Sequence, residues 1–407
     1  MKKDRFTSRR EFLRKCAAGL AGAAFLPALA RSRPLHETQS KDRKFLCRTL
    51  GRTGLRLPIV SMGATRAINL VHSALEEGIV HIDTSSIYEN GNHERMLGEV
   101  FKTLSRDSFV IATSAAWENF VKDSDPPFDK IRKKFNPKIL QEEIEGSLKR
   151  LGLDFIDIYY IANVYSREFA LYEPYMKVCE NFKKAGKTRF IGITVHRNEP
   201  EVIRAAVESK VWDVVLTAYN FRKTYYKELR AAVREAAAAG LGVVAMKTQA
   251  GVYWDKARTK KINMKAALKW VLQDENVHTA VPAFANYEEM MEDLSVMEDL
   301  TLTLEEKQDL KLGEELGFSG LYCQHCGSCR GQCRDDIDIP TLMRCYMYLF
   351  GYLEPKKARE TLRSWTSADI SCKNCQRCEV QCSLGFDVKS RALDIARILE
   401  VPKEFLG

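Results

Sequence analysis

Two short cysteine blocks near the end of the 407-residue chain share one spacing. Residues 323–333 and 372–382 each follow the pattern Cys-x2-Cys-x2-Cys-x3-Cys. Three cysteines within seven residues can bind one iron-sulfur cubane, and the fourth, which follows after three more residues, reaches a second cluster. We therefore predict two [4Fe-4S] clusters with crossed ligand sets. The first set is Cys323, Cys326, Cys329 and Cys382, and the second is Cys372, Cys375, Cys378 and Cys333.

Two other uses of these cysteines compete with this interpretation. Structural zinc usually takes two CxxC pairs rather than two triple runs with an extra cysteine. Disulfides form in exported proteins, but CxxCxxC has poor geometry for them. Arg334 and Ser383 follow the fourth cysteines, where proline is usual. The segment between the blocks has a helical pattern, so we predict a mostly α-helical dicluster ferredoxin domain over 317–407.

The N-terminus has the pattern of a targeting signal. Arg9 and Arg10 in TSRREFLRK precede the weakly apolar stretch CAAGLAGAAFLPALA, which is too short to span a bilayer stably. This resembles a twin-arginine export signal cleaved after Ala30, with a basic N-terminal helix as the alternative. We predict a signal over 1–30, a linker over 31–44 and a periplasmic protein that loads its cofactors before export. No other run approaches membrane-spanning length, so no stable membrane span is expected after signal removal.

The positive charge of the chain does not indicate nucleic-acid binding. The formal net charge is +9, but residues 1–30 carry seven Lys/Arg and two Asp/Glu, which leaves +4 after cleavage. Eight thiolates around two clusters, each of charge about +2, would remove about four more charges. The mature protein would then be nearly neutral, and no nucleic-acid partner is expected.

Eight apolar runs alternate with amphipathic stretches between about 45 and 310. They are 59–64, 80–86, 109–115, 155–163, 189–195, 214–220, 242–248 and 278–284. Continuous apolar runs of this length are typical of parallel strands buried on both faces. The pattern predicts an α/β fold, a (β/α)8 TIM barrel over 45–316, with a hairpin at 47–58 closing its floor. Functional residues are then expected at the carboxyl ends of the strands.

Several motifs of the barrel resemble the aldo-keto reductases. They are RTLGRTGLRLPIVSMGA, HIDTSSIYENGNHERMLGEVF, RFIGITVH and GVVAMKTQAG. The resemblance, closest to a subgroup with a twin-arginine signal and an iron-sulfur tail, implies a catalytic Tyr and Asp at Tyr88 and Asp83. The family's catalytic Lys and His are replaced here by Ser114 and Ala162. Taken alone, Asp83 is equally well explained as a cap of the next turn, and Tyr88 as a packing residue.

The resemblance also implies contacts with NADP(H), but several of the residues that would make them are replaced. Thr194, Lys247 and Asn286 are the candidate cofactor-binding residues, and Lys247 is also explained as a rim lysine exposed to solvent. Val195 and Leu216 stand where the family usually offers polar contacts, and Ala283 replaces a glycine of the phosphate-binding segment. The substitutions favour a pocket that no longer uses a nicotinamide, although a cofactor trapped before export stays open.

Together these features predict an exported iron-sulfur oxidoreductase with an aldo-keto-reductase-like barrel. Electrons would pass between a small carbonyl or alcohol substrate in the barrel and an external redox partner through the two clusters. The alternative is a catalytically degenerate barrel that serves as an electron-transfer subunit or docking scaffold. Ser114 and Ala162 motivate both hypotheses.

Overall fold

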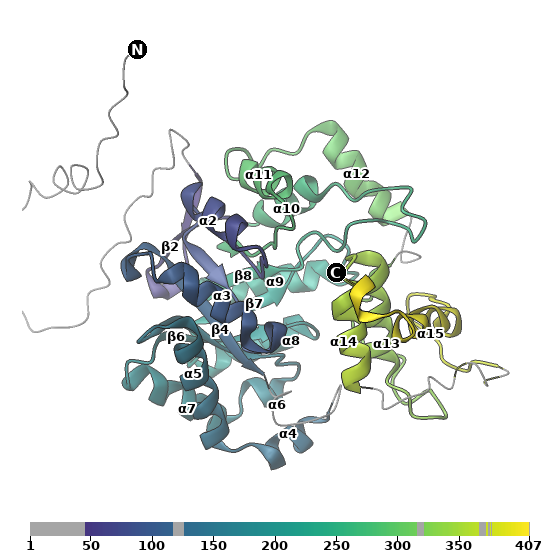
Figure 1. The fold of residues 1–407 in the computed structure, drawn as a ribbon, viewed down its shortest axis with the longest axis horizontal. Coiled ribbons are helices and arrows are strands. Elements are labelled where there is room, and N and C mark those ends of the chain that lie inside the picture. Colours follow the sequence, from purple (N-terminus) through teal and green to yellow (C-terminus); the bar gives the residue numbers. More distant parts are fainter. Residues whose placement is uncertain are drawn as a thin grey trace, which may run out of the picture. The chain divides into compact units, whose positions relative to one another are not determined.

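A computed structural model of the chain describes residues 45–116, 126–315, 321–365, 372, 375 and 377–406. Most of these residues form one parallel sheet surrounded by helices, followed by a smaller helical segment (Figure 1). The signal predicted at 1–30 and the linker at 31–44 lie outside the described residues.

The central sheet has seven parallel strands in the order of the sequence, β3 to β9. Their bounds are β3 His81–Asp83, β4 Val110–Ala116, β5 Ile156–Ala162, β6 Thr188–Val195, β7 Val214–Ala218, β8 Gly242–Met246 and β9 Thr279–Ala280. Each of them begins within two residues of an apolar run identified in the sequence. Every residue of β5 is buried, as expected for a strand covered on both faces.

The first predicted strand, 59–64, is shorter than expected. It forms isolated parallel bridges, Val60 with Ala280 and Met62 with Ile82, and is not a continuous strand. The amide of Ser61 donates to the carbonyl of Ala280 at 2.8 Å, so the segment bonds to β9 on one side and to β3 on the other. Pro282 has no amide hydrogen, which limits the ladder beyond β9. This segment therefore joins the two edges of the curled sheet.

The predicted hairpin precedes this segment. Strands β1 (Cys47–Thr49) and β2 (Arg56–Pro58) pair antiparallel around the short 3-10 helix η1 (Gly51–Thr53). Leu50 packs into the interior of the sheet so closely that a Cβ on Gly242 would lie 2.6 Å from its Cγ. The hairpin closes the amino ends of the strands, as the sequence predicts.

Helices cover the outside of the sheet (Figure 1). Their bounds are α2 Ile68–Glu76, α3 Asn92–Phe101, α4 Phe128–Lys134, α5 Pro137–Leu151, α6 Arg167–Ala170, α7 Glu173–Lys184, α8 Glu199–Ser209, α9 Tyr226–Ala238, α10 Met264–Leu272, α11 Tyr287–Ser295 and α12 Leu304–Glu315. The expected stop signals are present, since Gly152 ends α5 in the left-handed conformation and Gly240 follows α9 with a φ of +82°. The apolar faces of these helices and the outer face of the sheet share one core.

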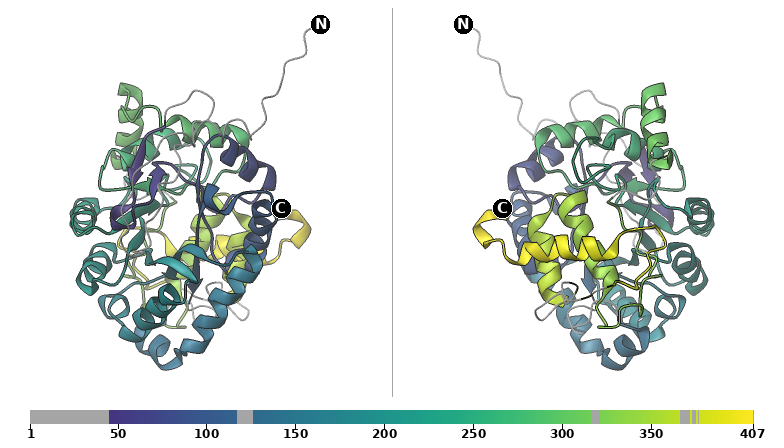
Figure 2. Two further views of the ribbon diagram at one scale, coloured as in Figure 1. Left: turned by 90° about the vertical axis from the view of Figure 1, so that its left-hand side faces the viewer. Right: turned by 90° about the vertical axis from the view of Figure 1, so that its right-hand side faces the viewer.

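The described part of the C-terminal segment consists of helices joined by turns and irregular chain, in which most of the cysteines lie. It contains α13 (Ile339–Tyr346), the π-helical turn η6 (Met347–Gly351), α14 (Pro355–Trp365) and α15 (Val388–Ala396). These helices share a second core that includes Leu342, Leu362 and Ile395. In the right-hand view of Figure 2 the helices of this segment lie across the ring of barrel helices. Within the described ranges, none of the helices has both the length and the apolar character of a membrane span.

Candidate functional site

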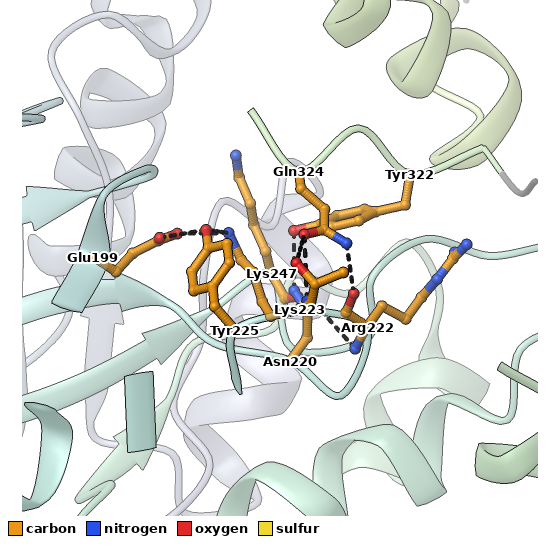
Figure 3. Close-up of polar contacts among 9 residues, drawn as sticks. Glu199, Asn220, Arg222, Lys223, Tyr225, Lys247, Tyr322 and Gln324 are labelled. Carbon is orange, nitrogen blue, oxygen red and sulfur yellow. Dashed lines mark hydrogen bonds and ion pairs between the residues drawn. The ribbon is translucent and has the colours of Figure 1, made fainter. Parts of the chain in front are cut away.

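The C-terminal segment binds the loops at the carboxyl ends of the strands. The side-chain amide of Asn220, just after β7, donates to the Tyr322 hydroxyl at 3.0 Å. The amide nitrogen of Gln324 donates to the Arg222 carbonyl at 2.9 Å, while its oxygen accepts from the Thr224 hydroxyl at 3.0 Å (Figure 3). Gln324 lies between two of the predicted cluster ligands. The first cysteine block is therefore attached to the end of the barrel where active sites of this fold lie.

A buried ion pair supports the loop that receives this block. The Lys223 ammonium lies 2.6 Å from Glu199, the first residue of α8, and both side chains are at most 1% exposed. The Tyr225 hydroxyl donates to the other oxygen of Glu199 at 2.7 Å (Figure 3). Burial opposes the charge on Lys223, but Glu199 raises the pKa of Lys223 above its ordinary value. Sequence analysis missed this pair because its members are 24 residues apart and belong to no motif.

Asp83 ends β3 and is buried, and none of the described cationic side chains forms an ion pair with it. The side chain is buried, and its Oδ2 atom has no hydrogen-bond partner among the described residues. Burial raises the pKa of Asp83 to about 8. Ser114, which the sequence resemblance places at the position of the family's Lys, donates to the Ser85 hydroxyl at 2.8 Å. Ala162, at the position of the family's His, is buried at the end of β5.

Tyr88 lies close to Asp83. Burial raises the pKa of Tyr88 to about 12, and the charge of Asp83 contributes to the rise. The ammonium of Lys357, from the C-terminal segment, acts in the opposite direction. The structure thus brings the two candidate catalytic residues together in a dry environment, where the Asp83 carboxyl is the group that titrates nearer neutrality.

The unpaired Asp83 carboxyl should make stability depend on pH. Because its folded-state pKa is raised, this group contributes stability that is present at low pH and is lost as the pH rises towards about 8. Asp83→Asn should therefore flatten the decline in the urea midpoint between pH 5 and pH 9. The exposed Asp107 offers a matched control, Asp107→Asn. Equal pH profiles for wild type and Asp83→Asn would contradict the burial argument.

The three residues predicted to bind a nicotinamide cofactor make different contacts. The Thr194 hydroxyl accepts a hydrogen bond from the Asn163 amide at 2.9 Å. Lys247 follows β8 with a φ of +55° and is half-buried, whereas sequence analysis allowed an exposed rim lysine. Burial, together with neighbouring cations, lowers the pKa of Lys247 to about 7. Its ammonium takes part in none of the contacts in Figure 3.

Asn286 caps α11 in a way that does not suit a phosphate. Its side-chain oxygen accepts from the Glu289 amide at 2.9 Å, and its nitrogen donates to the Glu289 carboxylate at 3.1 Å. The second oxygen of Glu289 accepts from the Ala285 amide at 3.0 Å. A carboxylate thus occupies the donors at this helix start, where the family's phosphate-binding segment would lie. An anionic phosphate would be repelled there, so the residues do not fit NADP(H).

The first predicted ligand set lines one cavity. Its walls include all four cysteines of that set: Cys323, Cys326, Cys329 and Cys382. The Sγ atom of Cys326 lies 3.1 Å from the hydroxyl of Ser383, which directly links the two cysteine blocks. Ser383 occupies the position where proline is usual, and it places a hydroxyl against the sulfur of a predicted ligand.

The four cysteines of the second predicted ligand set also lie near one another. Cys372 lies close enough to the other three members that, after burial, their charges raise the pKa of its thiol. They are Cys333, Cys375 and Cys378. None of the described cysteines, which include all eight, forms a disulfide.

The chemistry of these donor sets fits iron-sulfur clusters. Burial and the neighbouring thiols Cys323 and Cys382 raise the pKa of Cys329 to about 12, so the group resists ionisation unless a cation is present. Among the described residues, no three His, Cys, Asp or Glu side chains are placed to hold a single metal ion. A cubane differs in this respect because each thiolate binds a separate iron atom.

Basic side chains lie between the first cysteine set and the barrel. His325, between Cys323 and Cys326, lies near enough to His196, just after β6, to influence its pKa, and each has a buried ring nitrogen without a hydrogen-bond partner among the described residues. Lys247 and Arg344 are close enough to both imidazoles to lower their pKa values, after burial. Sequence analysis singled out Lys247 but not the cluster itself, which forms only when the C-terminal segment packs on the barrel.

Comparisons of sequence agree with the architecture. A sequence model described as the aldo/keto reductase family matches residues 51–265. L-galactose dehydrogenase of Arabidopsis thaliana is 31% identical over 169 residues, which cover 37% of this chain and 49% of that protein. NADH-specific methylglyoxal reductase of Escherichia coli (strain K12) is 30% identical over 160 residues, which cover 38% and 48%. The chain therefore spans about half the length of these curated relatives.

Comparisons of structure give the fold. Aldo-keto reductase AKR11C1 from Bacillus halodurans, in its holo form, superposes with a TM-score of 0.51 at 19% identity, covering 66% of this chain and 96% of that chain. The thermostable aldo-keto reductase Tm1743, solved with the inhibitor epalrestat, gives a TM-score of 0.51 at 22% identity, covering 67% and 100%. At this level of identity the likeness concerns the fold of the barrel alone.

Proposed function

Because the chain belongs to the aldo/keto reductase family, whose sequence model matches more than half of it, we propose that it is an exported iron-sulfur oxidoreductase. In this proposal, electrons pass between a small carbonyl or alcohol substrate in the barrel and an external redox partner via two [4Fe-4S] clusters. The twin-arginine signal at 1–30 and a periplasmic location belong to the same proposal. Membership of the family supports the coarser statement, that the chain is an aldo-keto-reductase-like oxidoreductase.

One observation carries the proposal: the first cysteine set lies against the carboxyl ends of the barrel strands. Gln324, between two of its members, bonds to the loop after β7. His325 lies near His196, just after β6. Cys323, Cys326, Cys329 and Cys382 would hold one cluster, and Cys372, Cys375, Cys378 and Cys333 the other. A redox group at the first set would then be next to the substrate pocket.

Proton transfer falls to Tyr88 and Asp83 in this scheme. Reduction of a carbonyl needs two electrons and two protons, and a buried pocket must supply the protons from its own side chains. Tyr88 gives its phenolic proton to the substrate oxygen, and Asp83, which with a pKa of about 8 is protonated at pH 7, returns a proton to Tyr88. Tyr88 can then supply the second proton, which goes to the substrate carbon with the second electron. In alcohol oxidation the same groups accept the protons.

No step is assigned to a nicotinamide. Glu289 holds the donors at the start of α11, and the polar contacts of the family are thinned at Val195 and Leu216. A dissociable cofactor would also have no supply outside the cytoplasm. Reducing equivalents therefore come from the external redox partner.

The second candidate function is a catalytically degenerate barrel that serves as an electron-transfer subunit or docking scaffold. The observation in its favour is the lone carboxyl of Asp83, which has lost the cation that the family places beside it. In that case the barrel would position the C-terminal segment and perform no chemistry of its own.

Analysis of protein matured through export tests the proposal. We expect about eight iron atoms per chain, a reduced-cluster signal by electron paramagnetic resonance after dithionite, and no NADP(H) in the supernatant after denaturation. Absence of iron would remove the proposal. Stoichiometric NADP(H) would instead show that the phosphate argument at Glu289 is wrong, and it would also exclude the scaffold function.

A further inference from the structure

The barrel lacks the cation that a phenol needs to act as an acid and base near neutral pH. A phenol ionises near pH 10 in water, and burial makes its anion less stable still. The family's Lys is Ser114 here, and the Ser114 hydroxyl bonds to Ser85. Tyr88 is half-buried next to Asp83, and where the Asp83 carboxyl ionises, its charge further disfavours a phenolate. Without a cation from elsewhere, proton transfer by Tyr88 would be slow.

Groups from four elements face the Tyr88 phenol. Asp83 comes from β3, Tyr348 from η6, and the ring of His93 from α3 meets the Tyr88 ring edge-on at 6.1 Å between centroids. Glu354 and Lys357 come from the start of α14, in the C-terminal segment. Among these described neighbours, Lys357 alone is a cation that acts directly on the phenol.

Two contacts hold the Lys357 ammonium in place. Its ammonium lies 3.3 Å from a carboxylate oxygen of Glu354 and 4.6 Å from the centre of the Tyr348 ring. The same oxygen of Glu354 lies 3.8 Å from the guanidinium of Arg66. Arg66 in turn lies 3.2 Å from Glu89, the residue that follows Tyr88. This chain of ion pairs connects the start of α14 to the loop that carries Tyr88.

We propose that Lys357 is a positioning residue that supplies, from the C-terminal segment, the cation missing beside Tyr88. The inference rests on the proposed function, because it requires Tyr88 to carry the substrate proton. When Tyr88 gives its proton to the substrate oxygen, the phenolate that remains is stabilised by the nearby ammonium. The C-terminal segment then has a second task besides holding cysteines, since it completes the proton-transfer site of the barrel.

The opposing possibility is that Lys357 serves only its ion pair with Glu354. Its side chain is 38% exposed, so solvent weakens that pair and the pair alone contributes little to stability. The two roles differ in one measurable quantity, the acidity of the Tyr88 phenol. Lys356, which is next in the chain and exposed, offers a matched control.

The test measures that acidity without a substrate. In the full-length protein, loaded with iron, Tyr88 is replaced by 3,5-difluorotyrosine, whose more acidic phenol titrates where the fold is stable, and the titration is followed by fluorine NMR. Lys357→Met should raise the pH midpoint by about one, whereas Lys357→Arg and Lys356→Met should leave it near the wild-type value. Equal midpoints for Lys357→Met and Lys356→Met would overturn the proposal.

A rescue variant sharpens the result. Ser114→Lys restores the family's cation beside Asp83, so in the Lys357→Met background it should lower the midpoint again. An Asp83→Asn background removes the titrating carboxyl, and the effect of Lys357 should persist there.

A separate assay, Tyr88→Phe with methylglyoxal as oxidant of the reduced protein, tests whether Tyr88 carries the proton. If that assay fails while the midpoints shift as expected, the catalytic role of Tyr88 is wrong and the position of the Lys357 cation stands.

Discussion

Replacing Cys382 by serine is expected to remove about half of the bound iron, from about eight atoms per chain to about four. The crossed ligand sets make a stronger prediction for double variants. Cys382→Ser combined with Cys326→Ser should still retain about four iron atoms, because both residues belong to one set. Cys382→Ser combined with Cys375→Ser should retain almost none. Iron and acid-labile sulfide analysis of anaerobically purified protein provides the measurement.

Cys47→Ser is the control, because Cys47 lies in the hairpin β1–β2 and belongs to neither set. It should keep the full iron content. If Cys382→Ser with Cys375→Ser instead kept about four iron atoms and Cys382→Ser with Cys326→Ser kept almost none, each cysteine block would bind its own cluster, and the crossed arrangement would be wrong.

Breaking the buried pair of Glu199 and Lys223 should have the largest effect on stability in the barrel. Lys223→Met leaves the Glu199 carboxylate buried without its partner, since both side chains are at most 1% exposed. Removal of one member of such a pair typically lowers the free energy of unfolding by about 3–5 kcal/mol. Urea denaturation followed by circular dichroism measures the change.

The double variant Glu199→Gln with Lys223→Met should recover much of this loss, because no unpaired charge remains. Lys102→Met removes an exposed pair, in which Lys102 and Glu99 are 68% and 64% exposed, and should cost at most about 1 kcal/mol. A loss of this small size in Lys223→Met would mean that Glu199 is neutral or solvated in the folded protein.

The order of elements in the barrel follows from local patterns. Apolar runs predict buried parallel strands because both faces of such strands are covered, and Gly152 and Gly240 stop their helices where the sequence suggests. The first strand is the exception. The run 59–64 is apolar enough for a strand, but its length depends on partners at both edges of the sheet, and β9 has only two residues. Pairing length is a property of the neighbours, which a single run does not contain.

In the candidate site, too, some residues can be predicted from local sequence and others cannot. Spacing predicts the cysteine sets, because the first three cysteines of each block can bind one cluster and the fourth can reach a second one. Asp83 and Tyr88 could be predicted as candidates because the motif that carries them is local. Lys357 and the pair of Glu199 and Lys223 escape, since their roles arise only when distant segments pack together. The carboxylate of Glu289 at the start of α11 is visible in the sequence, but its occupation of the Ala285 amide is a matter of geometry.

The central claim is that electrons pass between the barrel pocket and the cysteine sets, and anaerobic reoxidation tests it most directly. Protein reduced with dithionite and freed of excess reductant is mixed with methylglyoxal, and the visible absorbance of the clusters is followed with time. Wild type should reoxidise faster with methylglyoxal than without it, and Tyr88→Phe should lose at least tenfold of that acceleration, within the usual range for removal of a general acid. Reoxidation at one rate in both proteins, with or without the carbonyl, would contradict the account.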